Sequence, residues 1–302
     1  MSIVPTISTR SGYVAIVGRP NAGKSTLMNA LIGQKISITS RRPQTTRTAV
    51  TGIVTRESSQ FIFLDTPGFQ TEHRSGLTQA MERALRGALL EAQVVLWLID
   101  ATAREQLDPV LFSYLEGAPA PVIALNKIDK ISNKNKILTM IGPLDAAYQP
   151  KAVVPISAQT GLQLDTLLEA IAPLLPEQEF LFGGDEVTTV STRLLAAEMV
   201  REKLFRLLGQ ELPYATAVEI ESYEEPAEGG DLTRIGAVIL VDKPGQKAIV
   251  IGKGGAMLKQ IGAAARKDIE VLTGTRVYLR LWVKVRQSWA DDRRTLSGLG
   301  LK

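Results

Sequence analysis

A glycine-rich run near the N-terminus, Gly18 to Ser25, has the spacing of a phosphate-binding loop, G-x-x-x-x-G-K-S. Glycines allow successive backbone N–H groups to converge on phosphate oxygens, and a helix that begins there adds its partial positive charge. In such a loop Lys24 reaches the β- and γ-phosphates, and the Ser25 hydroxyl is a Mg²⁺ ligand. We therefore predict a nucleoside triphosphate site made of Gly18, Arg19, Pro20, Asn21, Ala22, Gly23, Lys24, Ser25 and Thr26.

A second motif, Asp65-Thr66-Pro67-Gly68, follows the apolar run 61–64. An aspartate at the end of a strand places a carboxylate where it can hold the Mg²⁺ shell through water, and a glycine N–H can bind a γ-phosphate. We predict Asp65 as a metal ligand beside Ser25. The predicted nucleotide site therefore also contains Asp65, Thr66, Pro67, Gly68 and Phe69.

The residues that follow two later predicted strands indicate which nucleotide base is bound. Asn126-Lys127-Ile128-Asp129 follows the apolar run 122–125, and Ser157-Ala158 follows 153–156. Guanine presents paired N1–H and N2–H₂ donors that a single carboxylate, Asp129, can accept, whereas adenine leaves that carboxylate unpaired. We expect Asn126 to tie this loop to the phosphate loop, the Lys127 stem to cover the base, and a backbone N–H of Ser157-Ala158 to reach the guanine O6.

The elements that position these motifs alternate up to about residue 175. Apolar runs predict buried strands, and helical stretches lie between them, an order that indicates a mostly parallel, doubly wound α/β sheet. The predicted strands are 13–17, 50–54, 61–64, 94–99, 122–125 and 153–156, and the predicted helices include 26–32, 79–90 and 162–171. Prolines and glycines then interrupt an acidic stretch. We predict a nucleotide-binding domain over 1–176, a linker over 177–192 and a second domain over 193–302.

The second domain has a different order of elements and a different charge. A helix (194–208) precedes two strands (216–221 and 234–241), two helices that meet at Gly252–Gly255, and a last strand (277–285), which predicts a smaller α+β unit. Residues 181–231 carry a net charge of −7 and residues 232–286 a net charge of +8. A basic block after an acidic one indicates a polyanion-binding surface or two oppositely charged faces of one domain.

The Gly252-Lys253-Gly254-Gly255 turn lies inside the basic block. A helix, a G-x-x-G turn and a second helix between strands form the core of a KH module, which binds RNA. The additional helix and strand before this core indicate the second KH topology. We predict RNA contacts from Lys247, Gly252, Lys253, Gly254, Gly255 and Lys259.

Composition excludes several classes of protein. The 302 residues contain no cysteine, which excludes disulfides, thiolate nucleophiles and zinc sites built on sulfur. The single histidine, His73, argues against a His-rich metal site or a His-based relay. The N-terminus lacks the pattern of a secretory signal, and the longest apolar run is far shorter than the ~20 residues of a membrane span. We expect a cytoplasmic, monomeric protein.

The motifs GRPNAGKSTLMNAL, PQTTRT, DTPGF and NKID, together with the C-terminal residues 281–292, are similar to those of the Era family of GTPases. This resemblance spans the whole chain. It implies a GTP/GDP- and Mg²⁺-dependent GTPase domain joined to a type II KH domain that binds the 3′ region of 16S rRNA during assembly of the 30S ribosomal subunit. It also implies peripheral contact with the inner face of the cell membrane, which nothing in the sequence indicates.

The resemblance assigns further roles within the nucleotide site. Thr46, or alternatively Thr45, of the polar loop 37–48 would complete the Mg²⁺ shell when a γ-phosphate is present. Asn21 would either hold a K⁺ ion beside the phosphates, where charge accumulates in the transition state, or only shape the loop. The catalytic set is therefore Lys24, Thr46, Asp65, Gly68 and Asn21.

Phe69 occupies the position at which many GTPases carry a glutamine that orients the attacking water. A phenyl ring cannot form those hydrogen bonds, so we predict slow intrinsic hydrolysis. Two other functions remain open. The chain could be a membrane-associated or tRNA-modification GTPase, whose accessory domains differ, or an RNA-binding module with a purely structural nucleotide site. The intact Lys24, Ser25, Thr46 and Asp65 argue against the last.

Overall fold

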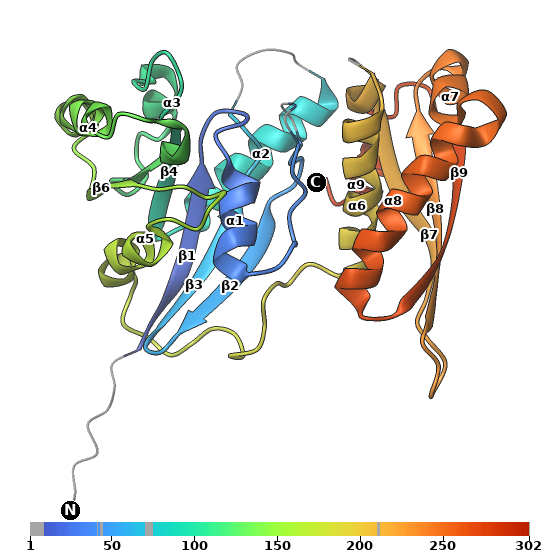
Figure 1. Ribbon diagram of the computed structural model, residues 1–302, viewed down its shortest axis with the longest axis horizontal. Coiled ribbons are helices and arrows are strands. Elements are labelled where there is room, and N and C mark those ends of the chain that lie inside the picture. The colour runs from blue at the N-terminus through green and yellow to red at the C-terminus, as the bar shows by residue number, and fades with distance from the viewer. Residues whose placement is uncertain (1–8, 41, 43–44, 70–74, 210–211, 302) are drawn as a thin grey trace, which may run out of the picture. The chain divides into compact units, whose positions relative to one another are not determined.

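The computed structural model describes residues 9–40, 42, 45–69, 75–209 and 212–301. Contacts divide the chain into two compact units (Figure 1). The first unit comprises Met1–Ser37, Ala49–Thr71 and Ala84–Thr189, and the second comprises Ile38–Thr48, Glu72–Arg83 and Val190–Lys302. The predicted domain boundaries at 176 and 193 remain predictions, because these units interleave along the chain.

The first unit contains a six-stranded sheet with the order β2-β3-β1-β4-β5-β6, in which only β2 is antiparallel to its neighbour. The strands are β1 (Arg10–Val17), β2 (Val50–Arg56), β3 (Ser59–Asp65), β4 (Val94–Asp100), β5 (Val122–Asn126) and β6 (Ala152–Pro155). The helices between them are α1 (Lys24–Ile32), α2 (Gly76–Glu91), α3 (Pro109–Tyr114), α4 (Asn135–Tyr148) and α5 (Leu164–Ile171). This arrangement confirms the predicted mostly parallel α/β sheet.

The sheet of the first unit is covered by helices, and its strands end at a common edge. One face packs Val17, Trp97 and Leu125 against side chains of α2, α3 and α4. The central strands are buried on both faces, which is typical of parallel strands covered by helices. Because parallel strands end at a common edge, the loops after β1, β3, β5 and β6 lie where such sheets bind ligands.

The segment predicted as a linker is bonded along the first unit. Gln178 exchanges hydrogen bonds with Thr9 and donates to the Ser11 carbonyl. Further along, the Val187 carbonyl accepts from the Ile53 N–H on the edge strand β2, at 2.9 Å. The predicted linker therefore runs along the edge of the sheet and satisfies a backbone group that an edge strand otherwise leaves open.

The second unit contains a three-stranded sheet, β7 (Thr216–Glu224), β8 (Leu232–Val241) and β9 (Arg276–Val285), in that order. β7 and β8 are antiparallel, whereas β8 and β9 are parallel. Figure 1 shows α6 (Thr192–Leu207) and α8 (Ala256–Thr273) beside this sheet, and their apolar side chains form a core with its inner face. With α7 (Pro244–Ile251), the elements from α6 to β9 follow the order α-β-β-α-α-β, which confirms the predicted type II KH unit. The short helix α9 (Arg293–Gly298) follows β9.

Candidate nucleotide site and RNA-binding surface

The phosphate loop runs from the end of β1 into α1. Neighbouring atoms lie so close to Gly18 and Gly23 that a larger residue would clash with them. A Cβ on Gly18 would lie 2.5 Å from the Leu98 carbonyl oxygen, and one on Gly23 would lie 2.4 Å from the Asn126 side-chain nitrogen. Gly23 also has a φ of 107° and caps α1 without a side-chain hydrogen bond. The first N–H groups of α1 are therefore oriented toward an anion in the loop.

Lys24 lies at the first position of α1 and is almost fully buried. Its Nζ donates to the carbonyl oxygens of Gly18, at 3.0 Å, and Arg19, at 3.2 Å. Burial lowers the pKa of Lys24 to about 8, although the nearby Asp65 carboxylate opposes this shift. The lysine is thus a desolvated cation held within the phosphate loop, where its attraction to phosphate is least screened.

Asp65 ends β3 and is fully buried. One of its oxygens accepts from the Ser37 hydroxyl at 2.7 Å, and the neighbouring Thr66 donates to the Ile16 carbonyl at 2.7 Å. With the Ser25 hydroxyl on the first turn of α1, this carboxylate supplies the hard oxygen ligands that Mg²⁺ prefers. The residues of the first unit therefore fit a magnesium ion. Ser37 is a partner of Asp65 that the sequence did not reveal.

The base-recognition loop is joined to the phosphate loop by side chains. Asn126 donates to the Ala22 carbonyl at 2.8 Å, and the Lys127 Nζ donates to the Asn21 carbonyl and to Asp100, both at 2.6 Å. Burial alone would raise the pKa of Asp100, but hydrogen bonds from Lys127 and Thr102 hold it below its ordinary value. Asp100 was not among the predicted site residues, although an acid at the end of a buried strand is a recognisable signal.

Ser157 orients the residue predicted to read guanine. Its hydroxyl donates to the Asp129 carboxylate at 2.7 Å, so one carboxylate oxygen is held by this contact. The N–H of Ser157 bonds to the Leu162 carbonyl, and that of Ala158 bonds to the Asn126 side chain at 2.9 Å. The predicted contact between this backbone and the guanine O6 stays a prediction, and it requires Asn126 to release the Ala158 N–H. Ile128 is buried beneath the loop.

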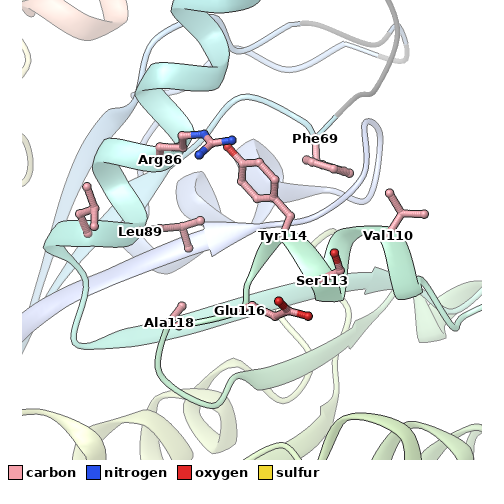
Figure 2. A pocket seen from close by; sticks show the side chains of 10 residues that line it. Phe69, Arg86, Leu89, Val110, Ser113, Tyr114, Glu116 and Ala118 are labelled. Carbon is pink, nitrogen blue, oxygen red and sulfur yellow. The ribbon is translucent and has the colours of Figure 1, made fainter.

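Phe69 packs against helix α3. Figure 2 shows its side chain facing Tyr114, and the two ring centroids are 4.9 Å apart. Arg19 lies over the Phe69 ring at 5.1 Å, and Arg86 lies over Tyr114 at 5.0 Å. Phe69, Tyr114 and Arg86 border a pocket of about 740 Å³ between α2 and α3. The Phe69 ring is therefore anchored by cation–π and aromatic contacts.

Backbone contacts hold the Asp65–Phe69 segment on the phosphate loop. The Phe69 N–H donates to the Gly18 carbonyl at 3.2 Å, and a Cβ on Gly68 would lie 3.1 Å from Pro20. Arg19 also pairs with Asp108 at 2.5 Å, and Asp108 caps α3 by accepting from the Leu111 N–H. Arg19 thus links the phosphate loop both to Phe69 and to the start of α3.

The loop predicted to hold Thr46 belongs to the second unit by its contacts. Thr46 and Arg47 are both buried there. The Arg47 guanidinium donates to the carbonyl oxygens of Thr216, at 2.8 Å, and Tyr214, at 3.2 Å, and lies over the Trp289 ring at 5.5 Å. Pro43, Gln44 and His73 lie outside the described residues.

Helix α6 binds the same loop from a second side. The Glu202 carboxylate is fully buried and accepts from the Thr39 N–H at 3.0 Å, while Arg201 donates to the Thr45 carbonyl. Glu202 also pairs with Lys203 at 2.8 Å and with Arg206 at 2.9 Å. Thr39, Thr45 and Arg47 of this loop are therefore held by hydrogen bonds to other parts of the second unit.

The G-x-x-G turn joins α7 to α8 in the second unit. Gly252 has a φ of 73°, and a Cβ there would lie 2.9 Å from the Met257 backbone nitrogen. Gly254 and Gly255 also have positive φ, but a Cβ on either meets open space. Gly255 caps the 18-residue α8 without a side-chain hydrogen bond. The turn thus exposes backbone N–H groups at the start of a long helix, which favours an anion.

The side chains around this turn are basic and apolar. Lys253 and Lys259 are exposed, and Lys247 is half-buried on α7. Ile249, also on α7, is 58% exposed, an apolar group beside a basic turn. A phosphate-facing turn next to exposed apolar side chains is the arrangement by which KH units hold single-stranded RNA.

The described residues contain neither an acidic or histidine-rich metal cluster nor a helix suited to crossing a membrane. Among those residues, no group of three or more His, Cys, Asp or Glu side chains could hold a metal ion. The residues proposed to hold Mg²⁺ are one carboxylate and hydroxyl groups, which do not form a cluster of this kind. The absence of such a cluster therefore does not bear on the magnesium site. Within the part of the chain that the structure describes, none of the helices has the length and apolar character needed to cross a membrane.

Comparisons with known proteins match both units. Residues 13–127 match a family described as a 50S ribosome-binding GTPase, and residues 211–290 match the KH domain. The chain is 50% identical to GTPase Era of Neisseria meningitidis, over 97% of this chain and 95% of the relative. It is 47% identical to GTPase Era of Xanthomonas oryzae, over 96% of this chain and 97% of the relative.

Two solved structures are similar over nearly the whole chain. One is a single-residue variant of Aquifex aeolicus Era bound to GDP and AlF₄⁻, with 39% identity and a TM-score of 0.92. The other is Era in complex with MgGDPNP and nucleotides 1506–1542 of 16S rRNA, with 39% identity and a TM-score of 0.90. Each alignment covers 97% of this chain and 99% of the other. With a nucleotide site in the first unit and a KH unit in the second, the chain belongs to the Era family of GTPases.

Proposed function

We propose that this GTPase is a molecular switch that binds and hydrolyses GTP, binds the 3′ region of 16S rRNA through its KH unit, and assists assembly of the 30S ribosomal subunit. The observation that carries this proposal is the similarity, over 97% of the chain, to an Era structure that holds both MgGDPNP and 16S rRNA nucleotides. The chemistry of the two sites supports it, since each unit has the residues for its own ligand.

The nucleotide is held by exchange of contacts that already exist in the first unit. Lys24 exchanges the carbonyl oxygens of Gly18 and Arg19 for phosphate oxygens, which are stronger acceptors because they are charged. Asp129, already oriented by Ser157, accepts the two donors of guanine. Asn126 and Lys127 keep the base loop and the phosphate loop in register.

Magnesium would be held by Ser25 and Asp65, with Thr46 as a further ligand in the GTP-bound protein. When bound, the ion neutralises charge that develops between the β- and γ-phosphates. Thr46 belongs to the second unit by its contacts, so its role as a ligand would couple residues 38–48 to the nucleotide. Reordering of a loop around a γ-phosphate is a known mode of GTPase switching.

Hydrolysis in the isolated protein is proposed to be slow, because the Phe69 ring offers no hydrogen bond to water and is packed against Tyr114. The N–H of Gly68 and the charge of Lys24 remain to stabilise the γ-phosphate. Asn21 has a φ of 63°, a conformation that asparagine tolerates, which supports a role in shaping the loop. Comparison of turnover in K⁺ and Na⁺ at equal ionic strength tests the K⁺ proposal, which equal rates would contradict.

The place of action proposed is the cytoplasm, where ribosomal subunits assemble in bacteria, and the proposed form is a monomer. Peripheral contact with the cell membrane remains a proposal from the family resemblance alone. The alternative function, a tRNA-modification or membrane-associated GTPase, would use a different accessory unit from the KH unit of this chain.

The test is to crosslink the full-length protein to RNA in cells and to sequence the recovered RNA. We expect crosslinks concentrated near the 3′ end of 16S rRNA, and a loss of these crosslinks in the Lys253→Asp/Gly254→Asp variant. As a control, the Asp145→Asn variant alters an exposed carboxylate on α4 and should crosslink like wild type. Crosslinks found mainly on tRNA would favour the alternative function.

A further inference from the structure

The outer face of the second unit's sheet carries side chains that the KH groove does not use. In the parallel pair β8–β9, Arg234 lies beside Tyr278 and Gly236 beside Arg280. The intervening residues, Ile235 and Leu279, belong to the core on the inner face. Since side chains alternate along a strand, Arg234, Tyr278 and Arg280 face outward together.

Aromatic rings and cations alternate on this face. Tyr278 is 56% exposed, and Arg234 lies over its ring at 6.0 Å. Arg280 lies over the half-buried Trp282 at 5.9 Å. A Cβ on Gly236 would lie 3.1 Å from the Trp282 ring, so the absence of a side chain at Gly236 leaves room for the indole. We call these four side chains, Arg234, Tyr278, Arg280 and Trp282, the outer-face patch.

The two arginines of the patch differ from the cations near the ends of β9. Arg276 pairs with Asp231 and Lys284 pairs with Glu221. Neither Arg234 nor Arg280 forms an ion pair with any residue that the structure describes. Their charge is therefore available to a ligand. On the adjacent strand β7, Glu224 lies opposite Arg234 and Glu219 lies opposite Val238 in the register, and neither forms an ion pair with a residue that the structure describes. Arg280 lies opposite Gly236 and is therefore the patch cation without an acidic cross-strand neighbour.

The rest of the outer face is already covered. Ala217, Val238 and Leu240 pack against Trp289, against apolar residues of the C-terminal segment and against residues 77–81 of α2, which belong to the second unit. The part of the outer face that these residues leave uncovered, the outer-face patch, consists of arginine and aromatic side chains. This composition suits single-stranded nucleic acid, whose bases stack on aromatic rings and whose phosphates attract arginine. The net charge of +8 over residues 232–286 favours the same polyanionic ligand.

We propose that the outer-face patch is a second RNA-contact surface, which binds single-stranded nucleotides that flank the segment held at the G-x-x-G turn. This proposal rests on the RNA-binding function proposed above. A KH groove holds about four nucleotides, so a longer RNA extends beyond it. β9 is the edge strand of the sheet, and α7 packs against both β8 and β9. RNA that leaves the groove can therefore pass around this edge to the patch.

The experiment measures RNA binding by the full-length protein with two probes, a tetranucleotide from the 16S rRNA 3′ region and a single strand of about 20 nucleotides that contains it, long enough to extend past the groove. We expect Tyr278→Ala to weaken binding of the longer RNA by about 5- to 150-fold, the range for loss of one stacked base, and to leave tetranucleotide binding unchanged. Tyr278→Phe keeps the ring and is the matched control, with wild-type binding of both RNAs. Arg280→Gln should lower the salt dependence for the longer RNA by about 0.7 in slope.

The outcomes separate this proposal from the function on which it rests. Equal affinity of Tyr278→Ala and wild type for the longer RNA overturns the second surface, and is the result expected if the patch binds a protein or only solvent. Loss of binding to both probes in Tyr278→Ala also overturns it, because the effect then comes from the KH groove or from folding. If Lys253→Asp/Gly254→Asp still binds both probes as wild type does, the KH function itself fails.

Discussion

The two glycine-rich turns of this chain, Gly18–Ser25 and Gly252–Gly255, are both suited to binding phosphate, but they differ in the burial of their lysine. Each leads into a helix whose N-cap is a glycine with positive φ and no side-chain cap. In the phosphate loop the lysine is buried and its pKa is lowered to about 8. In the G-x-x-G turn Lys253 is exposed to solvent.

The difference follows from the ligands. A nucleoside triphosphate is compact and can be enclosed, so a desolvated lysine and rigid glycines recognise it strongly and specifically. An RNA strand is a polymer that passes over a surface, so its phosphates meet solvated charges whose effect salt can screen. The first site should therefore fail when its shape changes, and the second when its charge changes.

Reversal of charge at the G-x-x-G turn should give the largest effect. Lys253→Asp with Gly254→Asp replaces one positive charge by two negative charges at a surface that faces a polyanion. We expect RNA binding to weaken by at least about 100-fold at moderate salt. GTP affinity and the thermal transition should change little, because residues 253 and 254 are both exposed and the phosphate loop lies in the other unit. RNA retention and GTP affinity are measured on one preparation, and a parallel loss of both would contradict the comparison.

Asp129→Asn tests shape and hydrogen-bond matching at the base. The amide offers one acceptor and one donor, so guanine's two donors cannot both be satisfied. We expect a loss of about 2–4 kcal/mol in GTP binding and a relative gain for xanthosine triphosphate. Titration calorimetry with both nucleotides measures it, with Asp145→Asn as the control for charge. Unchanged GTP binding would refute the assignment of Asp129.

The lowered pKa of the buried Lys24 predicts that GTP binding depends on pH. With a pKa of about 8, Lys24 is partly neutral above pH 8, and phosphate binding favours its charged form. GTP affinity should therefore fall by up to about tenfold per pH unit above pH 8, with proton uptake on binding. Because the pKa is lower than in the unfolded chain, Lys24 also makes the ligand-free protein more stable as pH rises from about 8 to about 10.5.

Calorimetry at about pH 8.5, just above the Lys24 pKa, in two buffers of different ionisation enthalpy measures this proton uptake. Lys24→Arg keeps its charge at this pH and should show less uptake. Uptake that is equal in the variant and in wild type would assign the proton to another group.

Gly254→Ala should give the smallest effect. Its Cβ would meet open space, and only the φ of 59° opposes it. We expect a cost of about 1 kcal/mol in stability or RNA affinity. Gly252→Ala, whose Cβ would contact the Met257 backbone, is the matched comparison and should cost more. If both variants bind RNA equally, close packing does not explain the first glycine of the turn.

The sequence predicted the chemistry of the nucleotide site because its ligand contacts come from short, contiguous motifs. Gly18–Ser25, Asp65–Gly68 and Asn126–Asp129 each follow an apolar run, and the alternation of strands and helices indicated the sheet whose edge holds them. Predicted strand limits differ from the structure by a few residues, as at β6, which starts at Ala152. Helix α4 was not among the predicted helices, and it contains Pro143, which usually interrupts a helix.

Tertiary structure alone decided which distant side chains support these motifs. Ser37 against Asp65, Asp100 against Lys127, Asp108 against Arg19 and Ser157 against Asp129 are pairs separated by 27 to 89 residues. The burial of Arg47 and Glu202, and the outward alignment of Arg234 with Tyr278, likewise arise only when separate elements pack. A local pattern determines the periodicity and backbone freedom of its own residues, whereas desolvation and pairing depend on what the folded chain brings against them.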